Sequence, residues 1–109
     1  MTEIDNQTKQ VLGTLGLAMK AGLLTSGEFM CEHAIRDGSA RLVIIADDAS
    51  PGTKKKFSDS CAYYSVPMIC IADKETLGAA LGKKERASVA VLDEGFAGKI
   101  RKKLTMEVS

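Results

Sequence analysis

Hydrophobic residues recur along the chain with two spacings, one typical of helices and one typical of buried strands. One stripe at helical spacing predicts a first helix that runs to about Ala21; its members are Val11, Leu12, Leu15, Ala18 and Met19. Gly22 follows, where a helix commonly stops because glycine reaches positive φ without a Cβ clash. Residues 1–8 are mostly polar and lack this period. We therefore expect a disordered or frayed leader there, followed by a single domain over residues 9–105.

The stretch from Ala21 to Ser50 predicts a short strand, a glycine turn, a second helix and a buried strand. Leu23 and Leu24 supply the short strand, and Thr25–Glu28 match the S/T-x-x-E capping box that opens a helix. This helix runs to about Asp37. Its predicted core face holds Met30, Cys31, Ala34 and Ile35, and its outer face holds Glu28, Phe29, Glu32, His33 and Arg36.

The rest of the chain repeats a strand followed by a helix. Leu42–Ala46 is an uninterrupted apolar run rich in β-branched residues, as in a central strand covered on both faces. Shorter apolar runs at Met68–Ile71 and Ala87–Leu92 predict two more strands. Helices capped by Ser50 and Asp73 follow the first two of these strands, and a last helix ends the chain. The inward residues of the three helices are Phe57, Cys61, Tyr64, Leu77, Ala80, Leu81, Phe96, Ile100 and Leu104. This alternation predicts an α/β fold, a three-layer α/β/α sandwich around a mixed sheet of about four strands.

Composition allows one hydrophobic core but does not identify a partner. The 109 residues, 45% of them hydrophobic, suffice for one domain without disulfide or metal support. The 15 basic and 14 acidic residues leave a net charge of only +1, which does not by itself indicate a nucleic-acid binder. The local balance differs, because the segment 83–103 holds seven basic residues against three acidic ones.

Two basic clusters have different interpretations. Lys54–Lys56 lies on a predicted amphipathic helix and is interpreted as its solvated face. Lys83, Lys84 and Arg86 lie in a loop after a helix stop, where long cationic side chains extend outward. They are either solvated or available to an anionic partner, and the sequence favours neither interpretation over the other.

The cysteines and the N-terminal segment bear on the compartment. Cys31, Cys61 and Cys70 are odd in number, lack CxxC spacing and each fall within an apolar pattern. Buried, reduced thiols of a cytosolic protein are the favoured interpretation. Nothing resembles a signal peptide, and no apolar run is long enough to span a bilayer. We therefore expect a cytoplasmic protein with no membrane partner.

Candidate chemistry centres on the glycine turn. Gly27 is either a plain helix cap or a point where a ligand approaches bared N–H groups. Phe29 is either a stacking platform for an unpaired base or a packing contact, and His33 lacks a partner at metal-ligand spacing. Asp47 and Asp48 lack the companions of a magnesium site. No catalytic residues, metal or cofactor are expected, and the sequence indicates a binding protein rather than an enzyme.

Three segments carry a family resemblance. AGLLTSGE, AIRDGSARLVIIADDAS and LGAALGK, in this order and spacing, resemble the kink-turn-binding ribosomal-protein family labelled L-seven-Ae, especially its small bacterial YlxQ branch. The match runs from about Leu12 to Leu92. It implies a three-layer α/β/α domain that binds structured, kink-turn-like RNA, with the Gly27 turn and the next helix against tandem sheared G·A pairs. The loop Lys83–Ala87 would cover the nucleotide that flips out of the bend.

On this resemblance the RNA-binding residues would be Lys20, Gly27, Glu28, Phe29, Met30, His33, Lys83, Lys84 and Arg86. Where the family's helix typically presents asparagine or lysine, then glutamate or glutamine, then lysine, this chain has Phe29, Met30 and His33. Leu23 stands where several relatives have lysine. If each lost base contact costs roughly 1–3 kcal/mol, kink-turn affinity falls by several orders of magnitude, partly offset by stacking on Phe29. The alternative hypothesis is a protein-interaction module that keeps the fold and binds a protein through Leu23, Phe29 and Met30.

Overall fold

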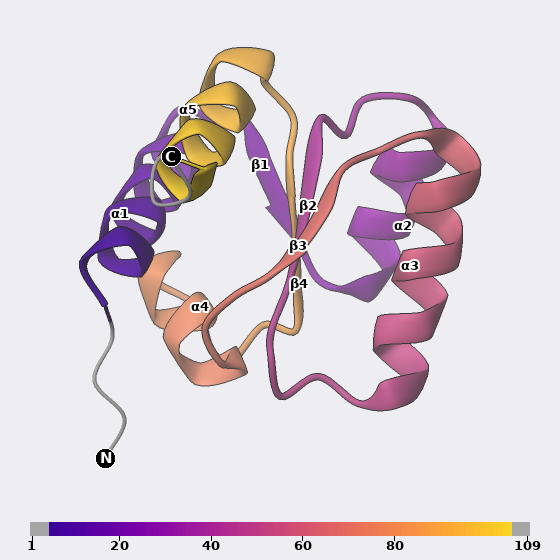
Figure 1. Ribbon diagram of the computed structural model, residues 1–109, viewed down its shortest axis with the longest axis horizontal. Coiled ribbons are helices and arrows are strands. Elements are labelled where there is room, and N and C mark those ends of the chain that lie inside the picture. Colours follow the sequence, from indigo (N-terminus) through magenta and orange to yellow (C-terminus); the bar gives the residue numbers. More distant parts are fainter. Residues whose placement is uncertain (1–4, 106–109) are drawn as a thin grey trace.

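The computed structural model describes residues 5–105 as alternating helices and strands around one sheet (Figure 1). In chain order the elements are α1 (Asn6–Lys20), β1 (Leu24–Ser26), α2 (Glu28–Arg36), β2 (Leu42–Ile45), α3 (Pro51–Tyr64), β3 (Met68–Cys70), α4 (Lys74–Ala80), β4 (Ser88–Val91) and α5 (Glu94–Thr105). Each strand is followed by a helix, as the hydrophobic pattern predicted.

The sheet has the strand order β1-β4-β2-β3, so the last strand of the chain lies between the first two. β4 pairs antiparallel with both of its neighbours, which places Ala90 opposite Thr25 on one side and Val43 on the other. β2 pairs in parallel with β3. The sheet is therefore mixed and four-stranded, which confirms the predicted fold class.

Helices cover both faces of this sheet. Figure 1 shows α1, α4 and α5 on one side of the strands and α2 and α3 on the other. Every residue of β2 and β4 is buried, which explains why both strands are apolar, except for the buried Ser88, and show no polar alternation. The largest fully buried side chains come from both helical layers and the sheet, and include Leu15, Ile35, Ile44, Phe57, Leu77 and Ile100.

The first helix begins earlier than expected. The Asp5 carboxylate accepts a hydrogen bond from the Thr8 N–H at 2.7 Å, so Asp5 caps α1 and the helix starts at Asn6. Residues 6–8, which we expected in the leader, are therefore helical. Residues 1–4, the rest of that expected leader, lie outside the described residues. The stop at Gly22 is confirmed, with φ of 74°.

The predicted capping box at Thr25–Glu28 is wrong. Thr25 and Ser26 belong to β1, where they pair with Ala90 and Val89, so their backbone is extended and their side chains do not cap α2. The N-cap of α2 is Gly27, with φ 95° and ψ 153°, and no side chain caps it. Sheet pairing thus takes precedence over the local capping preference.

Four burial predictions are also wrong. Met30 was placed on the core face of α2, yet it is 47% exposed, whereas Glu32 was placed on the outer face and is buried. The reason is that α2 packs against α3 as well as the sheet, so its buried stripe is turned toward Glu32. Tyr64, in the last turn of α3, is exposed beside Tyr63, and Cys70 is exposed on the edge strand β3.

The other two cysteines are buried as expected. Burial raises the pKa of Cys31 to about 12 and that of Cys61 to about 11, so both thiols stay protonated near neutral pH. Such thiols are poor nucleophiles and poor metal ligands.

Among residues 5–105, no cluster of three or more His, Cys, Asp or Glu side chains is arranged to hold a metal ion. None of the helices in that range has the length and apolar character needed to cross a membrane.

The cap of α4 gives a pH-dependent prediction. The hydroxyl and N–H of Thr76 lower the pKa of Asp73 below its ordinary value of 3.8. Because the folded-state pKa is depressed, the cap stabilises the protein above pH 3.8 and is lost as pH falls through the lowered value. We expect Asp73→Ala to lower Tm at neutral pH, and this deficit to shrink in acid. Asp73→Asn, which caps without titrating, is the control. If Asp73→Ala lowers Tm equally at neutral pH and at a pH well below 3.8, this account is wrong.

Candidate nucleic-acid interface

The turn at Gly27 joins β1 to α2 and is held to the sheet from one side. Its N–H donates to the Ser88 carbonyl at 3.0 Å, and its own carbonyl accepts from the Cys31 N–H at 3.0 Å to close the first turn of α2. The N–H groups of Glu28, Phe29 and Met30 precede that bond and belong to the open end of the helix. This end carries the positive pole of the helix dipole and is suited to anionic or electron-rich acceptor atoms.

A basic loop lies beside the turn, because Arg86 connects the two. Its Nε donates to Ser26 Oγ at 3.0 Å, and its Nη1 donates to the carbonyls of Glu85 at 3.0 Å and Lys84 at 3.3 Å. One guanidinium therefore holds the last residue of β1 and the backbone of the loop together. The sequence predicted both segments as candidates, but 60 residues separate the hydrogen-bonded pair, and only the fold brings them together.

The loop is also fixed against α4. The N–H groups of Lys83 and Arg86 donate to the carbonyls of Gly78 and Lys74. The loop backbone comes closest to α4 at Gly78, which has no side chain. A Cβ there would overlap the Lys84 carbonyl and lie 2.8 Å from the Glu85 Cα. The glycine lets the loop backbone lie directly on the helix, which leaves the Lys83 and Lys84 side chains exposed.

The remaining sequence-predicted residues fall in two places. Phe29 is 79% exposed, and His33 and Met30 are also exposed on α2, so these three side chains are open to a partner. Leu23 is half-buried. Lys20 is exposed at the end of α1, where it lines a separate hollow that reaches Gly82, immediately before the basic loop.

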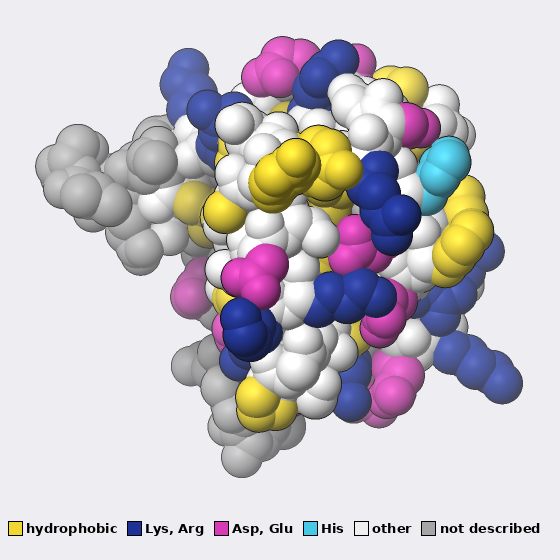
Figure 2. Space-filling view, turned by 90° about the vertical axis from the view of Figure 1, so that its right-hand side faces the viewer, with side chains coloured by type: hydrophobic (Ala, Val, Ile, Leu, Met, Phe, Trp, Pro, Cys, Tyr) yellow, Lys and Arg dark blue, Asp and Glu magenta, His cyan; other side chains and the backbone are white. Residues whose placement is uncertain are grey.

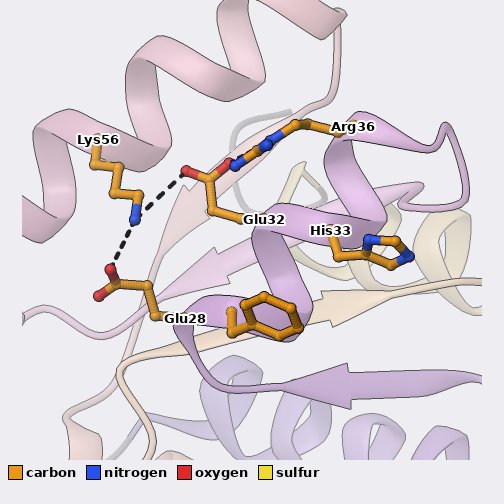
Figure 3. A pocket seen from close by; sticks show the side chains of 6 residues that line it. Glu28, Glu32, His33, Arg36 and Lys56 are labelled. Atoms are coloured by element: carbon orange, nitrogen blue, oxygen red, sulfur yellow. Dashed lines mark hydrogen bonds and ion pairs between the residues drawn. The ribbon is translucent and has the colours of Figure 1, made fainter.

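Lys56, Glu32, Arg36 and Ser60 lie at the border of the site, although the sequence did not predict them as part of it. The Lys56 Nζ contacts Glu28 Oε2 at 2.7 Å and Glu32 Oε2 at 4.0 Å, and so joins α3 to α2 (Figure 3). Both oxygens of Glu32 accept from the Ser60 hydroxyl at 3.1 Å. Arg36 Nε lies 3.8 Å from Glu32 Oε1. The sequence predicts Lys56 only as part of a solvated face, because both of its partners lie on another helix.

The Lys56 ion pair involves Glu28, one of the RNA-binding residues that the family resemblance implies. A carboxylate in the first turn of a helix can compete with a ligand for the open N–H groups. Figure 3 shows the Glu28 side chain directed toward Lys56 on α3. The pair occupies Glu28 Oε2 and partly neutralises its charge, which lowers the competition with a ligand at the turn.

Comparison with known proteins identifies relatives along most of the chain. Residues 9–100 match the Ribosomal protein L7Ae/L30e/S12e/Gadd45 family. The RNA-binding protein YlxQ of Bacillus subtilis is 44% identical over 86 residues, which are 79% of this chain and 86% of that protein. The RNA-binding protein YlxQ of Enterococcus faecium is 34% identical over 97 residues, 89% of this chain and 93% of that protein.

A solved structure agrees with these sequence relatives. A Bacillus halodurans protein of unknown function superposes with a TM-score of 0.84 at 38% identity, covering 87% of this chain and 96% of that one. The resemblance inferred from the three sequence segments is thus confirmed, including the YlxQ-like branch. The chain belongs to the Ribosomal protein L7Ae/L30e/S12e/Gadd45 family.

Proposed function

We propose that this protein is a non-catalytic, cytoplasmic RNA-binding protein of the translation apparatus that recognises kink-turn-like structured RNA. The observation that carries the proposal is the bond from Arg86 to Ser26, which joins the Gly27 turn and the basic loop in one surface. The names of the Bacillus subtilis and Enterococcus faecium relatives, both RNA-binding proteins, support it.

The chemistry of this surface suits a sharply bent RNA. A bend crowds phosphates, and the cationic side chains of Lys83 and Lys84 reduce their repulsion. The open N–H groups at the start of α2 can donate to base edges or phosphate oxygens in a widened groove. Gly27 keeps the backbone accessible, because it has no side chain and no atom of a non-neighbouring residue lies within 4 Å of the place a Cβ would take.

The side chains on α2 set the expected strength of binding. Phe29, Met30 and His33 replace the polar and cationic groups typical of the family, so fewer base-edge hydrogen bonds are available than in its usual mode. The exposed ring of Phe29 can stack on an unpaired base instead. Affinity should therefore depend more on phosphate contacts and stacking than on base-edge hydrogen bonds.

Titration of a kink-turn RNA at two salt concentrations tests the proposal. We expect binding that weakens steeply with salt, because cations of the loop displace counterions from the RNA. Lys83→Gln should lower the affinity and reduce the slope of log K against log salt by about one unit. Lys55→Gln, on the exposed side of α3 where Lys55 pairs with Asp59, is the control and should change neither. Absence of binding at low salt, or binding indifferent to salt, would contradict the proposal.

A second candidate function rests on the exposed apolar side chains of α2. Phe29 and Met30 are exposed on α2, and Leu23, which precedes β1, is half-buried. Exposed apolar side chains suit a protein partner as well as RNA. A pull-down distinguishes the two functions. Partners that are lost with Phe29→Ala but retained after nuclease treatment would favour a protein-interaction module, whereas removal of every partner by RNase would refute it.

A further inference from the structure

A shallow hollow on the outer side of α2 begins directly after the glycine turn, at Glu28, and extends along the helix to Arg36. It measures about 320 Å³ and is lined by Glu28, Phe29, Glu32, His33, Arg36 and Lys56. All but Lys56 lie on two adjacent rows of one helix, and Lys56 reaches in from α3. The helix supplies the floor of the hollow, so its shape does not depend on a loop.

The charges around the hollow balance one another. Two carboxylates, Glu28 and Glu32, face two cations, Arg36 and Lys56, and the ion pairs among them hold their charged groups in place. Figure 2 shows this face of the molecule, where basic and acidic side chains alternate and no single sign dominates. A balanced site does not favour a phosphate group. It suits a neutral, polar and flat ligand that carries both donors and acceptors.

Two side chains of the hollow, the ring of Phe29 and the guanidinium of Arg36, suit a planar base. The Phe29 ring is 79% exposed, so its face is accessible for stacking. Glu32, fixed by the Ser60 hydroxyl, contacts Arg36 at Nε. The Arg36 side chain is 66% exposed, so its guanidinium is accessible from solvent. A guanidinium in this position presents a donor fork that matches the O6 and N7 acceptors of guanine.

We infer that this hollow holds one unpaired guanine base, stacked on Phe29 with its O6/N7 edge on Arg36. The inference rests on the proposed RNA-binding function and specifies which base the exposed Phe29 ring stacks on. Phe29 and Arg36 are separated by seven residues, about 10 Å of helix rise, a span that a purine and an extended arginine side chain bridge. Adenine lacks the O6 acceptor, and pyrimidines offer a smaller stacking surface.

Mononucleotides test the hollow without the bent RNA. We expect GMP at millimolar concentration to shift the backbone amide resonances of residues 28–36 in a two-dimensional NMR spectrum of the full chain. AMP should bind more weakly, and CMP and UMP more weakly still. Inorganic phosphate should leave these resonances unchanged. Equal responses to all four nucleotides, the same shifts with phosphate alone, or no shift with GMP would each overturn the inference.

Matched variants separate stacking from the guanidinium contact. Phe29→Ala should weaken GMP binding about tenfold, at the lower end of the range for loss of base stacking. Tyr63→Ala, which removes an equally exposed aromatic ring on α3, should have no effect. Arg36→Lys keeps the charge but removes the fork, so it should abolish the preference for GMP over AMP. Arg41→Lys, outside the hollow, should retain that preference.

The two proposals fail in different ways. If a kink-turn RNA binds with the expected salt dependence but GMP leaves α2 unchanged, only the guanine contact is wrong. If GMP binds at α2 but no kink-turn RNA binds, the hollow is real and the proposed function is wrong. GMP binding that survives Phe29→Ala at full strength would overturn the stacked geometry.

Discussion

Gly78→Ala is expected to destabilise the protein by about 3 kcal/mol, near the upper end of the cost of overpacking. A Cβ at this position would overlap the Lys84 carbonyl and crowd the Glu85 Cα. These are backbone atoms, so no side-chain rotation can relieve the clash. For a chain of this size the loss corresponds to a fall in Tm of about 10–20 °C, measurable by thermal unfolding.

Gly13→Ala supplies the matched control for Gly78. Gly13 is also inside a helix, is exposed, and would meet nothing within 4 Å of an added Cβ. Alanine should stabilise α1 by about 0.5–1 kcal/mol because it loses less backbone entropy than glycine on folding. The same substitution is thus expected to lower Tm at Gly78 and to raise it at Gly13. Equal effects on Tm would show that helix propensity, and not the loop packed on α4, decides the outcome.

Gly27→Ala is expected to lose RNA affinity as well as stability. The backbone there has φ 95° and ψ 153°, a conformation open to glycine and strained for alanine by about 1–3 kcal/mol. Relief of that strain would turn the peptide unit that donates to Ser88 and would shift the start of α2. We expect kink-turn affinity to fall at least tenfold, measured by titration at low salt on protein shown to be folded.

Gly38→Ala separates strain from recognition. Gly38 also has positive φ, at 83°, and open space around an added Cβ, but it follows the opposite end of α2. Its substitution should cost about 1–2 kcal/mol and leave RNA affinity unchanged. If both variants lose affinity in proportion to their stability, the turn at Gly27 has no special role in binding.

The hydrophobic pattern and the caps predicted most of the fold. The uninterrupted run at β2 identified a central strand, and the caps at Ser50 and Asp73 placed the starts of α3 and α4. These features depend on contacts within a few residues, so the sequence contains them directly. The error at Thr25 and Ser26 has the opposite cause, since pairing with β4, more than sixty positions later, decides their conformation.

The candidate site was predictable as a set of segments but not as a geometry. Gly27 and the basic loop were identified from composition and turn chemistry, whereas their connection through Arg86 depends on strand order. The Lys56 contacts with Glu28 and Glu32 were missed because helical periodicity does not specify which neighbouring helix covers a face. Glu32 was misplaced for the same reason. The sequence also did not show why position 78 is glycine, because the backbone of Lys84 and Glu85 lies against it only in the folded chain.

The position of β4 between β1 and β2 has a consequence for biosynthesis. The ribosome delivers β1, the glycine turn and α2 early, when the strand that completes their side of the sheet has not yet been made. The Ser88 carbonyl that holds Gly27, and the Arg86 side chain that reaches Ser26, arrive about sixty codons later. A nascent chain that ends before Lys83 therefore carries the Gly27 turn and α2 of the candidate interface, but neither the basic loop nor the contacts that hold the turn. Such a chain should be unable to compete with finished protein for the RNA.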